Sequence, residues 1–118
     1  MKVQDIKEKF DLKLAAGGKG LNRDVTGGYC GDLLSDVMAN SLSGQIWLTI
    51  QSHQNILAVA VLKDLAAIIL VNGHKPDDET KTKAEDEGIP ILLSDADSYQ
   101  LAGELYSLGI IKKRDESI

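Results

Sequence analysis

The feature that most constrains this chain is a regular alternation between short apolar runs and helix-like segments. Four apolar or β-rich runs end near residues 30, 50, 71 and 94, with polar turns and helical patterns between them. This spacing is about that of one strand–helix unit. Strands that alternate with helices favour a parallel sheet with both faces covered. The sequence therefore predicts an α/β domain, a three-layer sandwich with a mostly parallel central sheet covered by helices on both faces.

The individual elements follow from periodicity and from turn residues. We expect strands over 25–30, 45–51, 66–71 and 89–93, and the alternating run 11–15 could form another. We expect helices over 3–10, over 56–62, over 76–87 ending at Gly88, and over a last segment ending at Gly109. A further helix would be capped by Asp32 and end at Ser43–Gly44. The run 56–62 could also be a strand, and the tail 112–116 reads as solvated.

Composition limits the class of protein. At 118 residues the chain has room for one domain, which we place over 1–118. A net charge of −5 argues against nucleic acid and against an anionic membrane surface as partners. No apolar run approaches the roughly 20 residues of a membrane span. The single cysteine excludes an intramolecular disulfide and fits a cytoplasmic location.

The glycine-rich and cysteine motifs give little support to catalysis. Gly17-Gly18-Lys19-Gly20 lacks the spacing and the hydroxyl residue of a nucleotide phosphate loop, so we interpret it as a turn. Cys30 stands among aliphatic residues, which favours a small core residue over a nucleophile. No His, Cys or Asp cluster has metal-ligand spacing, and no triad signature is present. We therefore predict no metal and no cofactor.

Polar residues follow each predicted strand, and these positions form the main candidate site. Loops after parallel strands gather at one edge of the sheet, where α/β proteins bind ligands. The candidates there are Gly27, Gly28, His53, Asn55, Asn72 and His74. They could line a small-molecule pocket, or they could be ordinary loop and capping residues. An enzyme acting through His53 and Asp95 is a third, weaker hypothesis.

Association of two copies is a separate expectation. A small domain with exposed leucines on its first or last helix would bury them against a second copy, and two-fold pairs are the commonest oligomer. Trp47, flanked along its strand by polar Gln45 and Thr49, could face such a partner as well as the core.

One ordered set of segments resembles a known family. The run from Asp24 to Ser35, with Thr26-Gly27-Gly28 at its centre, is similar to the signature of the DRTGG domain family, although Val25 stands where that signature has Arg. The resemblance continues through 44–50, 53–56 and 88–92, and covers about 21–109. It adds Asp24 and Thr26 to the candidate binding residues.

The resemblance implies a regulatory role. DRTGG domains are accessory modules beside CBS domains in regulated pyrophosphatases and within phosphotransacetylases. They are similar to the N-terminal domain of HPr kinase/phosphorylase, whose kinase chemistry lies in a separate domain. It also implies homodimers or higher oligomers. We therefore expect a non-catalytic regulatory or interaction module, a homodimer whose partner could be a regulated enzyme. The alternative is a sensor of a nucleotide-like small molecule at the carboxyl edge of the sheet.

Overall fold

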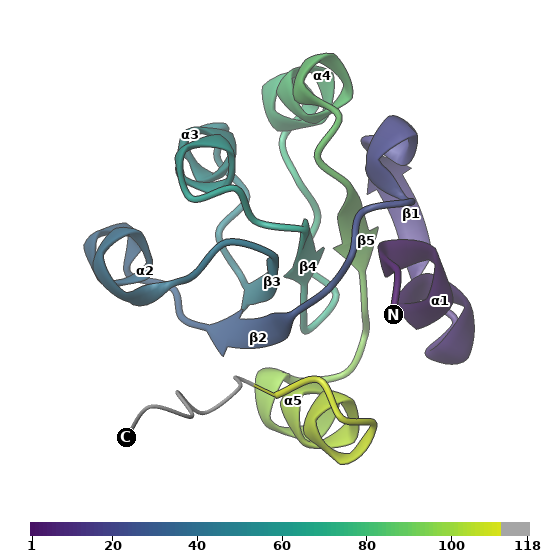
Figure 1. Ribbon diagram of the computed structural model, residues 1–118. Helices are drawn as coiled ribbons and strands as arrows, with labels where there is room; N and C mark the ends of the chain where they lie inside the picture. The colour runs from purple at the N-terminus through teal and green to yellow at the C-terminus, as the bar shows by residue number, and fades with distance from the viewer. Residues whose placement is uncertain (112–118) are drawn as a thin grey trace.

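The computed structural model describes residues 1–111 and has a five-stranded sheet at its centre (Figure 1). The strand order is β1-β5-β4-β3-β2, in which β2 to β5 are parallel neighbours and β1 lies antiparallel to β5. The strands are β1 (Lys13–Ala16), β2 (Gly27–Cys30), β3 (Gln45–Thr49), β4 (Ala67–Leu70) and β5 (Ile91–Leu93). The predicted mostly parallel sheet is thus confirmed, and the uncertain run near 11–15 forms its antiparallel edge strand.

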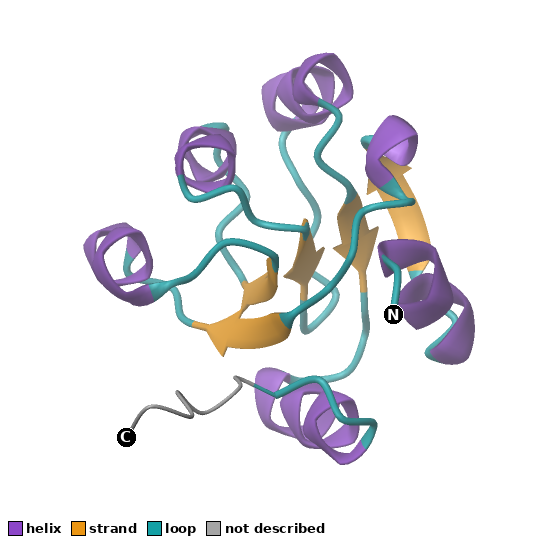
Figure 2. Ribbon diagram, in the orientation of Figure 1, coloured by secondary structure: helices purple, strands orange, loops and turns teal. Residues whose placement is uncertain are grey.

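Helices cover both faces of this sheet, as predicted (Figure 2). The helices are α1 (Val3–Lys9), α2 (Leu34–Asn40), α3 (Asn55–Leu62), α4 (Asp78–Glu87) and α5 (Ser98–Ser107), with a 3₁₀ turn, η1 (Gly18–Gly20). Strands β2 to β5 follow one another in both sequence and space. Connections of one hand therefore place α2, α3 and α4 on the same face. Helices α1 and α5 lie on the other face (Figure 1).

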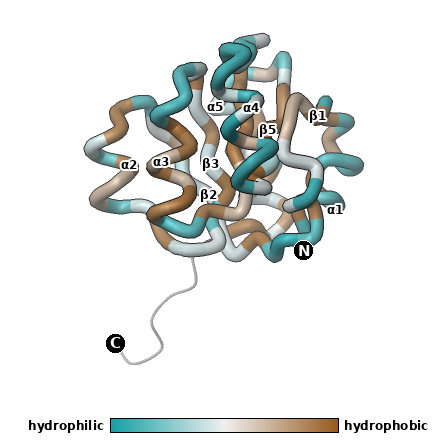
Figure 3. Tube along the Cα trace, turned by 90° about the horizontal axis from the view of Figure 1, so that it is seen from above, coloured by the Kyte–Doolittle hydropathy of each residue, from teal (hydrophilic) through white to brown (hydrophobic). Residues whose placement is uncertain are grey.

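Two apolar cores fill the spaces between the layers. Under α2 to α4 the core is centred on Trp47, Ile56 and Ile68. Under α1 and α5 it is centred on Ile46 and Ile69. All five residues of β3 are buried, because a strand covered on both faces has no solvent side. In Figure 3 α4 is largely teal whereas α3 is largely brown, because α3 is apolar on its outer side too, where Leu62 is exposed. Trp47 is fully buried, so its predicted role in facing a partner is wrong.

The best-predicted helices are α3 and α4. The run 56–62 is helical, which excludes the alternative of a strand. Helix α4 ends where predicted, since Gly88 takes the left-handed conformation with φ of 65°. The last helix runs to Ser107 with Leu108 as its C-cap, and Gly109 follows with φ of 98°, as predicted for the residue that ends it. The predicted solvated tail at 112–116 lies outside the described residues. In 1–111 no helix is long and apolar enough to cross a membrane.

Three predictions around β2 and α2 are wrong. Asp32 does not cap α2, whose N-cap is Leu33. Its carboxylate instead accepts hydrogen bonds from the Thr49 hydroxyl at 2.8 Å and from the Ile50 amide at 3.0 Å, which ties the end of β2 to the end of β3. Cys30 is exposed and is not a core residue, because β2 is an edge strand with neighbours on one side only. Helix α2 also ends at Asn40, before the predicted Ser43–Gly44.

Candidate functional site

The carboxyl edge of the sheet carries half of the predicted candidate residues. His53 lies in the loop after β3, and Asn55 is the first residue of α3. Asn72 and His74 follow β4. All four are exposed. Their shared position at this edge agrees with the prediction, whereas a binding role for each of them stays a prediction.

Local hydrogen bonds fix these loops. The backbone amide of Asn55 donates a hydrogen bond to Nδ1 of His53 at 3.1 Å, so one imidazole nitrogen is used within its own turn. Asn72 has φ of 57°, and its backbone amide donates a hydrogen bond to the carbonyl of Ala96 at 2.9 Å. The Gly73 amide donates to the carbonyl of Ser94 at 3.0 Å. The turn after β4 is therefore held against the turn after β5.

The other candidates lie at the opposite edge. Gly27 opens β2 and Gly28 follows it inside the strand, paired with Gln45 and Ile46 of β3. The prediction that these glycines form a loop after a strand is wrong. The apolar run begins at Val25, but strand pairing starts only at Gly27 and continues to Cys30. The glycines therefore lie at the amino end of the parallel strands, with Asp24 and Thr26 just before them.

Asp24 and Thr26 make contacts that hold this amino edge together. Asp24 pairs with Lys2 at 2.8 Å, and the Lys2 hydrogen bond and charge lower the pKa of the Asp24 carboxyl. The Thr26 hydroxyl donates to the carbonyl of Ser43 at 3.1 Å, and its amide donates to the carbonyl of Gly44 at 2.9 Å. These bonds join the N-terminus to β2 and β2 to the turn before β3.

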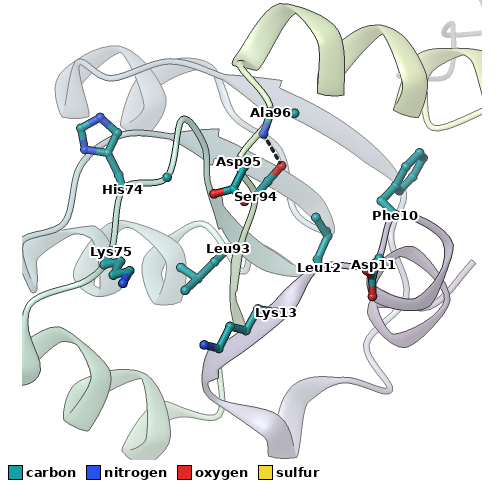
Figure 4. Close-up of a pocket in the computed structure, with 11 residues that line it drawn as sticks. Phe10, Asp11, Leu12, Lys13, His74, Lys75, Leu93, Ser94, Asp95 and Ala96 are labelled. Carbon is teal, nitrogen blue, oxygen red and sulfur yellow. Dashed lines mark hydrogen bonds between the residues drawn. The ribbon is translucent and has the colours of Figure 1, made fainter.

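A cavity of about 490 Å³ opens at the carboxyl edge, beside β4, β5 and β1 (Figure 4). Its lining residues are Phe10, Asp11, Leu12, Lys13, Gly73, His74, Lys75, Leu93, Ser94, Asp95 and Ala96. His74 is the only predicted binding candidate among them, and Asp95, named for the weaker enzyme hypothesis, also lines the cavity. A cavity of this size falls within the range of small-molecule sites. The structure therefore moves the centre of the candidate site away from His53 and Asn55, toward β1 and β5.

Sequence reasoning missed the contribution of β1 to this cavity. Lys13 pairs with Leu93 because β1 runs antiparallel to β5, so the start of β1 meets the end of β5. Phe10 and Asp11 precede β1 and lie at the same edge. The only available signal was the alternation over 11–15, which indicated a strand but gave neither its neighbour nor its direction.

A second, smaller cavity of about 210 Å³ lies between β2 and α5. Its lining residues are Gly28, Tyr29, Cys30, Leu48, Ala102, Leu105, Tyr106 and Ile110. Although Cys30 is exposed, partial desolvation of its sulfur, with a smaller effect of the Asp32 charge, raises the pKa of the thiol. A raised pKa keeps the thiol protonated and makes it a poor nucleophile. Within 1–111 no group of three His, Cys, Asp or Glu side chains could hold a metal ion.

Comparison with protein families decides the classification, since the model of the DRTGG domain matches residues 5–108. The chain belongs to the DRTGG domain family. The match begins before the predicted start at 21 and so includes α1 and β1. Val25, at the position of the signature Arg, is buried beside the N-terminus, where its amide donates to the carbonyl of Met1 at 2.8 Å. A DRTGG domain is a regulatory module.

A solved structure with the same fold is the regulatory region of a Clostridium perfringens pyrophosphatase, comprising CBS and DRTGG domains in complex with the activator diadenosine tetraphosphate. The TM-score is 0.68 at 14% sequence identity, and the match covers 99% of this chain. This DRTGG domain spans 52%, about half, of that chain. No protein with a curated description matches the sequence.

Proposed function

We propose that this DRTGG domain is a non-catalytic regulatory module that works as a homodimer and transmits a signal to an enzyme. Membership of the family supports the regulatory role. The observation that supports the dimer is the unpaired outer edge of β2. This strand pairs with β3 on one side only. Its open side lies next to the apolar cavity under α5, where Tyr106 is 68% exposed.

A second copy of the chain suits this edge. Two β2 strands can pair antiparallel around a two-fold axis, since a free strand edge is complementary to itself. Such pairing would cover Cys30 and Tyr106 and satisfy unpaired backbone groups. We therefore place the dimer surface on β2 and the end of α5.

The dimer is tested by light scattering coupled to size-exclusion chromatography. We expect twice the monomer mass for the unchanged chain and the monomer mass for Tyr106→Glu, because a charge would be buried without a partner. Leu62→Glu is the matched control, since Leu62 is 72% exposed on the opposite face of the sheet. A monomer mass for the unchanged chain at all accessible concentrations contradicts the proposal.

The sole cysteine gives an independent check of the surface. Neighbouring strands lie about 4.8 Å apart, so paired β2 edges would bring the two Cys30 residues within about 15 Å. A short bismaleimide linker should then join two copies. Cross-linking that persists in the monomeric Tyr106→Glu variant would show that the contact is random collision.

A second candidate function is a sensor of a nucleotide-like molecule, and the cavity at the carboxyl edge favours it. The similar pyrophosphatase region binds a nucleotide activator, which supports the same class of ligand here. A bound ligand raises the melting temperature by mass action. A panel of nucleotides and acyl phosphates that leaves the melting temperature unchanged contradicts the sensor and leaves the dimer standing.

The absence of catalysis is part of the proposal. It is supported by the surroundings of the groups that an enzyme would use. His53 accepts a hydrogen bond within its own turn, and the Asp32 carboxylate is occupied by Thr49 and Ile50. Nucleotide hydrolysis or transfer to a protein substrate that is lost in His53→Ala or Asp95→Asn would overturn it.

A further inference from the structure

The cavity at the carboxyl edge has two lysines at one end. Lys13 comes from β1 and Lys75 from the loop after β4, so residues far apart in sequence meet at this point. Together with Leu93, both also line an adjoining cavity of about 460 Å³. Figure 4 shows the two amines beside Leu93. The two hollows therefore share one wall that carries two positive charges.

The two lysines are among the six of ten described lysines and arginines that pair with no described carboxylate. Among the described residues, Lys2, Arg23, Lys81 and Lys83 each pair with a carboxylate, whereas no ion pair involves Lys13 or Lys75. Two unpaired like charges on one wall attract an anion, all the more in a protein of net charge −5. A phosphate accepts hydrogen bonds from two ammonium groups at once.

Carboxylates and an aromatic ring line the rest of the cavity. The carboxylates are Asp11 and Asp95, and in Figure 4 Asp95 lies across Leu93 from the Lys13 amine. It can accept hydrogen bonds from hydroxyl groups. Phe10 lies at the far end, beyond Leu12, and offers an apolar ring face for a planar group (Figure 4).

We infer that this cavity binds a nucleoside monophosphate, with its phosphate between Lys13 and Lys75, its sugar hydroxyls toward Asp95 and its base against Phe10. Three chemically different parts of the cavity wall match the three parts of this ligand. The volume of about 490 Å³ suits a molecule of this size. The inference rests on the second proposed function and specifies the ligand class and residues of the sensor.

The test is isothermal titration of the full chain with AMP, and separately with inorganic phosphate and adenosine. We expect AMP to bind more tightly than either fragment. Lys13→Gln and Lys75→Gln should each weaken AMP binding about tenfold, the loss of one charge-assisted contact. Lys19→Gln is the matched control, since Lys19 is exposed at the opposite edge in η1. This variant should bind AMP as tightly as the unchanged chain.

A further variant separates the two ends of the site. Phe10→Leu should weaken AMP binding and leave phosphate binding unchanged, because only the base reaches the ring. Melting temperatures of all variants report whether folding is intact. No heat from AMP at millimolar concentration overturns the inference, as does binding insensitive to both lysine variants. If other nucleotides still stabilise the protein in those lysine variants, the sensor function survives and this site does not.

Discussion

The two edges of the sheet use their polar residues differently. At the amino edge Lys2 pairs with Asp24, and Arg23 pairs with Asp64 at 2.7 Å, while Asp64 also accepts from the Ser43 hydroxyl at 2.6 Å. At the carboxyl edge a cavity is open and the lysines on its wall lack ion pairs among the described residues. The comparison teaches that most of the signature segment supports the fold, and it is the basis on which we propose recognition at the opposite edge.

Close backbone approaches make the amino edge sensitive to substitution. A Cβ atom at Gly17 would lie 2.0 Å from the carbonyl oxygen of Ile89, and one at Gly20 would lie 2.2 Å from that of Gly88. One at Gly44 would lie 2.4 Å from Oγ1 of Thr26. The predictions below test whether this edge carries stability and the other carries binding.

The largest effect is expected for Gly17→Ala. Gly17 has φ of 79°, and the added carbon would collide with backbone that cannot rotate away. Strain and collision together should cost about 4 kcal/mol, enough to unfold much of the protein. Urea unfolding followed by circular dichroism measures this loss. The control is Gly18→Ala, whose nearest neighbour is a leucine methyl at 3.3 Å; equal losses for the two variants would contradict the account.

Gly44→Ala should cost somewhat less, about 3 kcal/mol, from a φ of 83° and a contact with a side chain. Because the collision is with Oγ1 of Thr26, adding Thr26→Ala should recover part of the loss. A double-mutant cycle of unfolding free energies measures this coupling. Strict additivity of the two variants would show that Thr26 and Gly44 do not meet.

Thr49→Val tests a buried polar contact between the ends of β2 and β3 at the carboxyl edge. Thr49 is fully buried and its hydroxyl donates to Asp32. We expect a loss of about 1 to 2 kcal/mol, since the valine cannot replace this bond to a charged group. Chemical unfolding measures it. Thr82→Val, on the exposed face of α4, should change stability far less, and a similar loss there would remove the special role of Thr49.

The smallest effect is the pH dependence from Asp24. Lys2 lowers the pKa of this carboxyl below its ordinary 3.8, so the pair stabilises the folded protein above that pH. The contribution is lost as the pH falls through the lowered pKa. Asp24→Asn should therefore show a shallower loss of stability in acid than the unchanged chain, measured by thermal unfolding from neutral pH downward. Identical acid profiles would contradict the assignment.

Apolar runs and turn residues predicted the fold well, because each helix or strand depends mainly on residues that are close together in the sequence. The fully apolar β4 and the charged α4 ending at Gly88 follow from burial and from left-handed glycine geometry. The site was harder to predict, because it depends on which strand lies beside which. Nothing near Lys13 in the sequence points to Lys75, and only the antiparallel pairing of β1 with β5 brings them together. Gly27 and Gly28 misled for a different reason, since the pattern assigned them to a turn at the carboxyl edge although they pair with β3 at the start of β2.

The most direct test of the division between the two edges is an amide NMR titration of the full chain with AMP. We predict that chemical shifts change at residues 10–13, 73–75 and 93–96, around the cavity, and stay unchanged at residues 24–28. Changes concentrated at 24–28, with none around the cavity, would show that the signature segment itself is the binding site and would contradict the account.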